Sequence, residues 1–445
     1  MAMTRRQFLS SSGAAMIAGT MAKRSVFGAN DRISLGFIGC GHRGTRVTGG
    51  LMEEGARLAY LCDLRRDRME SAWEFLSHAQ DTPPTMVHDM HEVFADDSVD
   101  AVVIGTPDHW HAVPTVWACQ AGKDVYVEKP ASHNIFESRK MVEAAEKYGR
   151  IVQLGTQNRS AAYMRAARER IANGDLGAIG LVKVYNLLPG GPFHLNEPED
   201  PPDSFVDGGW DTWLGRTTRS WPYHANLFSN GWKHFWEFTG GDMADDGIHQ
   251  IDAAFMVMGD RGVPRSVRCM AGRYVHGGDD SERPDVQVVD WDFGDHIVTF
   301  ELSGYPDYMR KTDGSTRAGD AFPDWRTNAT RIEIYGSERF MYLGRHGGGW
   351  VIQEDGETVD RMSGVVPDME HYANFLECVR TRERPAGDIA VTHASNVAMH
   401  MANIAHRMGN TALNFDAHTE RFDNSEANAH IDPPGREQYS MPETV

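Results

Sequence analysis

This chain has few cysteines, fewer basic than acidic residues and no long apolar run. The five cysteines are odd in number and widely spaced, so they form no recognisable disulfide framework or zinc spacing; they are Cys40, Cys62, Cys119, Cys269 and Cys378. Acidic residues outnumber Lys and Arg by 63 to 44, which gives a formal net charge of −19. Nucleic acid is therefore not an expected partner, because phosphate binding needs clustered Lys and Arg. No run is apolar enough to predict stable membrane insertion.

The N-terminus has the pattern of an export signal. Thr4-Arg5-Arg6-Gln7-Phe8-Leu9 is followed by a mildly apolar segment rich in Ala, Gly, Ser and Met, which ends in small residues near Ala22. This pattern is typical of twin-arginine signals, which direct folded proteins out of the cytoplasm. We predict that residues 1–30 are a signal peptide and that the protein is periplasmic or otherwise exported by this route.

From Ile33 to Leu154, short apolar runs alternate with helical patterns. Strands are expected at 33–38, 57–62, 100–104, 124–127 and 151–154, with helices near 43–54, 65–78, 112–121 and 136–148. Such alternation is the mark of a parallel sheet covered by helices. The predicted fold class is therefore α/β, with an N-terminal doubly wound sheet of the Rossmann type.

A glycine-rich turn stands directly between the first strand and the first helix. Its sequence, Gly39-Cys40-Gly41-His42-Arg43-Gly44, permits a tight turn and lets a pyrophosphate approach the helix N-terminus. Asp63 follows 19 residues after Gly44, where a carboxylate can accept hydrogen bonds from the adenosine ribose. That carboxylate favours NAD, whereas Arg65 and Arg66 leave NADP possible.

Two more motifs follow later strands, at the edge where open α/β sheets bind ligands. One is Thr106-Pro107 with His111 shortly after it, and the other is Glu128-Lys129-Pro130. Lys129 is placed to contact both a nicotinamide ribose and a substrate hydroxyl. Gln157, after the last strand of this sheet, is a candidate contact of the nicotinamide.

Asp245 and His249 lie four residues apart on a helix expected at 245–258, so their side chains project from one face. Asp245 could hold the imidazole in one tautomer while His249 takes a proton from a substrate hydroxyl. A metal site using these residues with Asp242 and Asp246 is the alternative. No second cluster with ligand spacing accompanies it, so no metal is assigned.

Taken together, the glycine turn, Thr106-Pro107 with His111, Glu128-Lys129-Pro130 and the segment from Gly240 to His249 resemble the Gfo/Idh/MocA oxidoreductases. The similarity runs from about Arg32 to about Phe415, and segments 210–215, 232–238 and 375–409 suggest the exported twin-arginine branch. The resemblance implies a catalytic group of Lys129, Asp245 and His249. The expected cofactor contacts are Gly39, Gly41, His42, Arg43, Gly44, Asp63, Thr106, Pro107, His111, Glu128, Lys129 and Gln157.

The resemblance also implies a second domain with an open, mostly antiparallel sheet, whose exposed face commonly makes oligomer contacts. The sequence agrees, with strand-like runs at 181–188, 265–275, 286–292, 296–302, 330–335, 339–343 and 349–353 and helical patterns at 161–173, 245–258, 368–380 and 390–408. The predicted organisation is a dinucleotide domain at 31–155, an α+β domain at 156–420 and a tail at 421–445. A homodimer or homotetramer is expected.

Segment 190–239 has no sustained period but is crowded with aromatic residues. It is either a stacking platform for sugar rings or a small core that pins the loop, and some of its residues are expected to do each. The substrate-binding candidates are Arg159, Trp213, Tyr223, His224 and Asp242.

Export limits the chemistry, because no maintained pool of free NAD is expected outside the cytoplasm. We therefore expect a tightly bound NAD, or NADP, that is reduced and reoxidised in place. One candidate function is an oxidoreductase acting on a sugar or sugar derivative. The alternative is a redox-neutral, NAD-dependent glycosidase or lyase, which works by transient oxidation, elimination and re-reduction.

Overall fold

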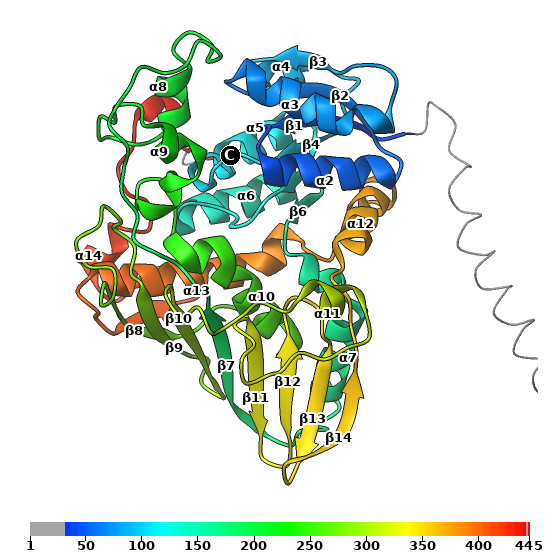
Figure 1. Cartoon of the computed structure of the whole chain (residues 1–445), viewed down its shortest axis with the longest axis vertical. Coiled ribbons are helices and arrows are strands. Elements are labelled where there is room, and N and C mark those ends of the chain that lie inside the picture. The colour runs from blue at the N-terminus through cyan, green and yellow to red at the C-terminus, as the bar shows by residue number, and fades with distance from the viewer. Residues whose placement is uncertain (1–31, 442–443) are drawn as a thin grey trace, which may run out of the picture.

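The computed structural model describes residues 32–441 and 444–445, so the predicted signal peptide lies outside the described residues. Figure 1 shows two sheets with helices packed between them, and the two sheets belong to different domains. In this described part of the chain, none of the helices is long and apolar enough to cross a membrane.

The first sheet has six parallel strands in the order β3-β2-β1-β4-β5-β6, the order of a Rossmann fold. Its strands are β1 (Ser34–Ile38), β2 (Arg57–Cys62), β3 (Thr85–Val87), β4 (Ala101–Ile104), β5 (Asp124–Val127) and β6 (Val152–Leu154). The main helices are α2 (His42–Glu53), α3 (Arg66–Leu76), α5 (Ala112–Gln120) and α6 (Ile135–Tyr148). The five predicted strands and four predicted helices are confirmed, while β3 and the six-residue α4 (Met90–Ala95) were missed.

Two glycines of the turn are required by backbone conformation and packing. Gly39 has a φ of 81°, and a Cβ there would lie 2.7 Å from the Thr106 backbone nitrogen. A Cβ on Gly44 would lie 2.6 Å from the Phe37 ring. Side chains at either position would therefore push the first helix away from the sheet.

The second sheet has ten strands in the order β14-β13-β12-β11-β7-β10-β9-β8-β15-β16. Only β7 and β10 pair in parallel, which confirms the mostly antiparallel sheet expected for the second domain. The strands are β7 (Ile179–Leu187), β8 (Ser266–Gly272), β9 (Val286–Asp292), β10 (Ile297–Ser303), β11 (Arg331–Gly336), β12 (Phe340–Gly344), β13 (Trp350–Glu354), β14 (Glu357–Met362), β15 (Leu413–Asp416) and β16 (Arg421–Phe422). The last three had not been predicted.

Three helices cover one face of this sheet: α7 (Ala162–Ala172), α10 (Ile248–Val257) and α13 (Ile389–Arg407). Figure 1 shows α10 and α13 between the two sheets, so this layer joins the domains. Along β8 and β9, buried residues alternate with exposed ones, so the described residues leave the opposite face of the sheet uncovered along these strands.

The chain returns to the first domain near its C-terminus. Helix α12 (Asp368–Thr381) packs against α2, and its Tyr372 and Phe375 join the core that includes Phe37. Met441 and Val445 pack into the core on the other side of the first sheet. A division of the chain into consecutive domains therefore does not show that these C-terminal segments pack against the first domain.

His371 links α12 to the first sheet and makes folding sensitive to acid. It is fully buried, with Nε2 lying 3.0 Å from the Leu154 carbonyl oxygen and Nδ1 lying 2.8 Å from Ser160 Oγ. Burial lowers the pKa of His371 to about 4. Below pH 6.5 the unfolded chain therefore binds a proton that the folded chain does not, and stability falls as the pH drops.

We expect this residue alone to lower the free energy of unfolding by about 2 kcal/mol between pH 7 and pH 5. Urea unfolding at the two pH values measures the change. His371→Gln keeps a donor and an acceptor but does not titrate, so its loss over the same interval should be smaller by that amount. Equal losses in the two proteins would contradict the prediction.

Candidate active site

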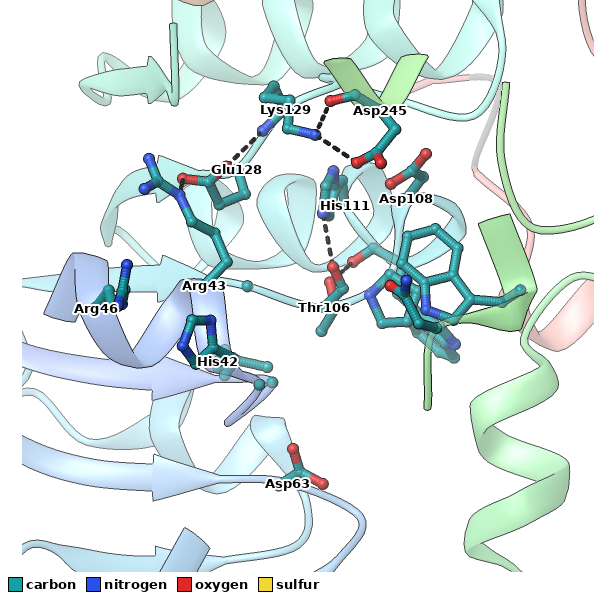
Figure 2. A pocket seen from close by; sticks show the side chains of 18 of the residues that line it. His42, Arg43, Arg46, Asp63, Thr106, Asp108, His111, Glu128, Lys129 and Asp245 are labelled. Carbon is teal, nitrogen blue, oxygen red and sulfur yellow. Dashed lines mark hydrogen bonds and ion pairs between the residues drawn. The ribbon is translucent and has the colours of Figure 1, made fainter. Parts of the chain in front are cut away.

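A cavity of about 980 Å³ opens at the carboxyl edge of the first sheet. This main cavity is lined by the glycine turn and the loops after β4 and β5 on one side, and by the start of α10 and the aromatic segment on the other. Figure 2 shows Lys129 and Asp245 meeting across it from different domains.

The part of the cavity beside the glycine turn has the features of a dinucleotide site. Gly41 caps α2 without a side-chain hydrogen bond, and a Cβ there would meet only the Gly105 carbonyl oxygen, at 3.9 Å. The first backbone N–H groups of α2 are therefore accessible to an anion. The Asp63 carboxylate is fixed by the backbone nitrogens of Cys40 and Arg65, at 2.7 and 2.8 Å. Burial raises its pKa above the ordinary value.

Eleven of the twelve predicted cofactor residues line the main cavity: Gly39, Gly41, His42, Arg43, Asp63, Thr106, Pro107, His111, Glu128, Lys129 and Gln157. Gly44 is the exception, because it packs beneath the turn against Phe37.

Contacts between the loops hold several of these residues in place. Arg43 Nε donates to Glu128 Oε1 at 3.1 Å, which ties the first helix to the loop after β5. The two ring nitrogens of His111 lie 2.6 Å from the Pro130 carbonyl oxygen and 2.9 Å from the Thr106 carbonyl oxygen. The imidazole of His111 thus bridges two loops of the cavity wall.

Lys129 and Lys233 converge on Asp245. Lys129 Nζ lies 3.0 Å from Asp245 Oδ1 and also donates to the Asp245 carbonyl oxygen, and Lys233 Nζ lies 3.0 Å from both carboxylate oxygens. Burial opposes the charge of Asp245, but the two ammonium groups hold the pKa of this carboxyl well below its ordinary range. Asp245, Asp108 and Glu128 outweigh burial at Lys129 and raise its pKa. Lys129 is therefore an ammonium group in the neutral pH range.

Asp245 stands on a π-helical turn, Met243–Gly247, which directly precedes α10. The sequence predicted one regular helix over this region, and the π turn is a correction. A Cβ on Gly247 would lie 2.7 Å from the Phe300 ring, so the absence of a side chain lets the turn pack closely against β10. Turns of this kind are frequent at functional sites because they present extra side chains to a cavity. Here they present Asp245 and Asp246.

His249 lines the same cavity and is 8% exposed. Burial lowers its pKa well below the ordinary value, and the positive charges of Arg345, Lys129 and Arg43 act in the same direction. His249 is therefore a neutral imidazole at pH 7. Among the described residues, none makes a hydrogen bond with its ring.

One predicted relationship is wrong. Asp245 does not orient His249, because its carboxylate is occupied by Lys129 and Lys233. Lys233 was missed because it comes from a segment without a periodic pattern, so only the tertiary fold brings it to the site.

The predicted substrate residues are divided among different places. Trp213 lines the main cavity, whereas Arg159 forms a buried ion pair with Asp252, with nitrogen–oxygen distances of 2.7 and 2.8 Å. Tyr223 is buried in the aromatic segment, His224 Nδ1 lies 2.7 Å from the Asn196 carbonyl oxygen, and neither lines the cavity. Asp242 pairs with Arg283 beside a second cavity. The prediction that Arg159, Tyr223 and His224 contact a substrate is thus corrected, because none of the three lines the main cavity.

The aromatic segment is both a small core and a cavity wall. Trp210 and Trp213 stack with centroids 4.8 Å apart, and Trp221 and Phe235 complete a separate hydrophobic cluster. His109 and Trp110 fasten this cluster to the first domain, since their ring nitrogens lie 2.8 and 3.0 Å from the Trp213 carbonyl oxygen. Trp213, Phe228 and Trp232 reach the main cavity.

Residues 33–156 match the family described as "Oxidoreductase family, NAD-binding Rossmann fold", and residues 353–441 match its "C-terminal alpha/beta domain". Both of these segments match models of the Gfo/Idh/MocA oxidoreductase family. Among the relatives of this chain is scyllo-inositol 2-dehydrogenase (NAD(+)) of Bacillus subtilis, which is 24% identical over 79% of this chain and 86% of its own. A glycosyl hydrolase family 109 protein of Solibacter usitatus is 34% identical over 27% of this chain and 29% of its own.

The chain spans less than half the length of several curated relatives that it matches. Its fold is similar to that of a levoglucosan dehydrogenase solved with NADH and levoglucosan. The TM-score is 0.63 and the sequence identity 15%, over 86% of this chain and 99% of the other. At that identity the likeness bears on the fold alone.

Replacing Lys233 with methionine tests whether this residue positions the Lys129–Asp245 pair. The change removes one of two ammonium groups that stabilise the Asp245 carboxylate, so we expect kcat/KM to fall about 10-fold. Steady-state kinetics measure the effect. Lys183→Met, on strand β7 outside the lining of the main cavity, is the matched control. A variant with unchanged kcat/KM would show that Lys129 alone holds the carboxylate.

Proposed function

We propose that the mature protein is an exported, NAD(P)-dependent oxidoreductase that acts on a hydroxyl-bearing carbon of a sugar or sugar derivative and keeps its cofactor tightly bound. The observation that carries this proposal is the meeting of Lys129 with Asp245 and His249 in one cavity, beside the glycine turn. These residues come from two domains, so only the assembled fold creates the site.

The residues beside the turn fit NAD. The accessible N-terminus of α2 suits a pyrophosphate, and the fixed carboxylate of Asp63 suits an adenosine ribose. When bound, the nicotinamide would accept a hydride from the substrate carbon. Arg68 also lines the cavity, so a 2′-phosphate would find a cation nearby and NADP stays a second possibility.

Lys129 acts on the substrate oxygen as a charged donor. Its raised pKa makes it unsuited to take a proton, but its ammonium group stabilises negative charge that develops on the oxygen as the C–H bond breaks. Asp245 and Lys233 keep that ammonium group in place. A lysine at this place could either polarise or deprotonate the oxygen, and the ionisation of Lys129 favours the first role.

His249 accepts the hydroxyl proton. Burial and the nearby positive charges lower the pKa of His249, and the same positive charges lower the pKa of a substrate hydroxyl in the cavity, which offsets part of the cost of the proton transfer. Because the imidazole starts neutral and free of hydrogen bonds to the described residues, it can receive the proton without first releasing one.

The export proposal rests on the arginine pair in residues 1–30, and it requires a cofactor loaded before translocation. The test uses protein purified from the exported fraction. Mass spectrometry after denaturation is expected to detect about one nicotinamide dinucleotide per chain. A panel of sugars and glycosides is then added while absorbance at the reduced-nicotinamide band is followed. Absence of bound dinucleotide would overturn cofactor retention, and absence of reduction with every sugar would overturn the oxidoreductase proposal.

The same panel separates the redox-neutral alternative, which shares these catalytic residues. Aryl glycosides would release p-nitrophenol without net cofactor reduction, and the substrate would lose a carbon-bound deuterium to solvent. Net accumulation of reduced cofactor with an unmodified sugar selects the oxidoreductase.

We also propose that the chain forms a homodimer or homotetramer through the uncovered face of the ten-stranded sheet. Met270, Val288 and Tyr335 expose 67%, 44% and 36% of their surface on this sheet. A monomer would leave this apolar surface in contact with water, which is unusual for a patch of this kind. Sedimentation equilibrium of the wild type and of Met270→Lys tests the proposal. A monomeric wild-type protein would contradict it.

A further inference from the structure

A second, smaller cavity of about 220 Å³ adjoins the main one. Asp245, Asp246 and Lys311 line both cavities, so the second begins where the catalytic group ends. Its far side is formed by the start of the aromatic segment, at Gly190 and Gly191, and by the loop after β8. The volume is below the ~300–1,000 Å³ of sites for drug-sized ligands, so it suits a single ring rather than a whole ligand.

Each cationic side chain that lines this second cavity is paired with an aspartate. Arg273 pairs with Asp279, Arg283 with Asp242, and Lys311 with Asp246. Asp285 accepts hydrogen bonds from three backbone N–H groups, at 2.7 to 2.9 Å. Burial would raise the pKa of Asp285, but these hydrogen bonds outweigh burial and lower it. An anionic ligand would therefore find no free cation among these residues, and the Asp285 carboxylate, which is in none of these pairs, already accepts from three backbone N–H groups.

Hydrogen-bonding capacity nevertheless remains in the cavity wall. Arg273 Nε and His276 Nε2 are buried nitrogens without a partner among the described residues. Burial lowers the pKa of His234 to about 3, so its imidazole is a neutral donor or acceptor, and it is stacked on Phe193 with ring centroids 4.0 Å apart. Leaving buried polar groups unpaired costs about 1–3 kcal/mol each, which a ligand rich in hydroxyl groups would relieve.

Glycines keep this space open. A Cβ on Gly190 would lie 2.4 Å from the Gly304 carbonyl oxygen, so these two segments approach each other without side chains. Gly191 is exposed at the rim, has no neighbouring atom within 4 Å of a Cβ, and does not have a positive φ. A large side chain can therefore be introduced there without backbone strain.

We propose that the second cavity binds a second, uncharged sugar ring, so that the substrate is a neutral glycoside of at least two rings. The ring that reacts lies beside Lys129 and His249, and the next ring lies across Asp245 and Asp246 in the second cavity. This inference rests on the proposed oxidoreductase function for the identity of the reacting ring, but binding in the second cavity is measurable without turnover.

The experiment is calorimetric titration of the cofactor-containing protein with neutral disaccharides of glucose, galactose, mannose and xylose in α and β linkages, each beside its monosaccharide. At least one disaccharide is expected to bind about 10-fold or more tightly than its monosaccharide, as one or two added hydrogen bonds would give. The aldobiouronic acid of the same linkage, which adds a carboxylate, is expected to bind more weakly than the neutral disaccharide.

Gly191→Tyr fills the rim and is expected to abolish the disaccharide advantage while monosaccharide binding is kept. Gly314→Tyr is the matched control, because Gly314 is equally open but does not line the second cavity. His276→Ala, which removes an unpaired nitrogen, gives a second test and should reduce the advantage without blocking the cavity.

Three results would overturn the inference: no disaccharide that binds better than its monosaccharide, an advantage that survives both variants, or preference for the uronate. Since titration detects binding alone, a protein that binds disaccharides but never reduces its cofactor would keep this inference and refute the oxidoreductase proposal.

Discussion

Lys129→Met is expected to lower kcat by about 10²–10³-fold, because it removes the charged donor that stabilises the developing oxyanion. The donor acts mainly in the transition state, so kcat and kcat/KM should fall by similar factors. The measurement is steady-state reduction of the retained cofactor with the sugar that the panel identifies.

Two controls make this result specific. Bound dinucleotide, measured by mass spectrometry, should stay near one per chain, since the glycine turn and Asp63 are untouched. Lys183→Met carries the same change outside the lining of the main cavity and should retain wild-type rates. If Lys129→Met keeps its cofactor and also turns over normally, Lys129 has no role at the reacting oxygen.

His249→Ala should reduce turnover by about 10²–10⁴-fold, the usual contribution of a positioned proton acceptor. The truncation leaves room beside the substrate, so added imidazole is expected to restore part of the rate. In the wild-type protein, kcat/KM should stay level as the pH falls through 6.5, since the lowered pKa keeps His249 neutral below the range of an ordinary histidine.

Thermal unfolding of His249→Ala should resemble that of the wild type, because its ring makes no hydrogen bonds to the described residues. Full activity in a folded His249→Ala protein would assign the proton to another group. A wild-type profile that falls near pH 6.5 would contradict the buried, neutral state of the imidazole.

The first domain was predictable because its signals are local. Strands buried on both faces give continuous apolar runs, and Gly39 and Gly44 occupy positions where a Cβ cannot fit. Strand β3 was not predicted, because it has only three residues, of which only Val87 is buried, and so shows no recognisable hydrophobic pattern. The same locality explains why eleven of the twelve predicted cofactor residues line one cavity.

The rest of the site depends on tertiary packing. Spacing placed Asp245 and His249 on one helix face, but it could not show that two lysines from distant segments take the carboxylate. It also could not separate Arg159, used in an ion pair with Asp252, from an arginine that faces a ligand. Return of α12 to the first domain is likewise invisible to a linear division of the chain.

The most direct test of the joint site is a single turnover with a sugar deuterated at all its carbon positions, followed by mass spectrometry of the extracted cofactor. If Lys129 and His249 act on one carbinol beside the nicotinamide, the wild-type cofactor gains one deuterium, and the Lys129→Met cofactor gains almost none in the same time. Product formed with an unlabelled cofactor would contradict that arrangement.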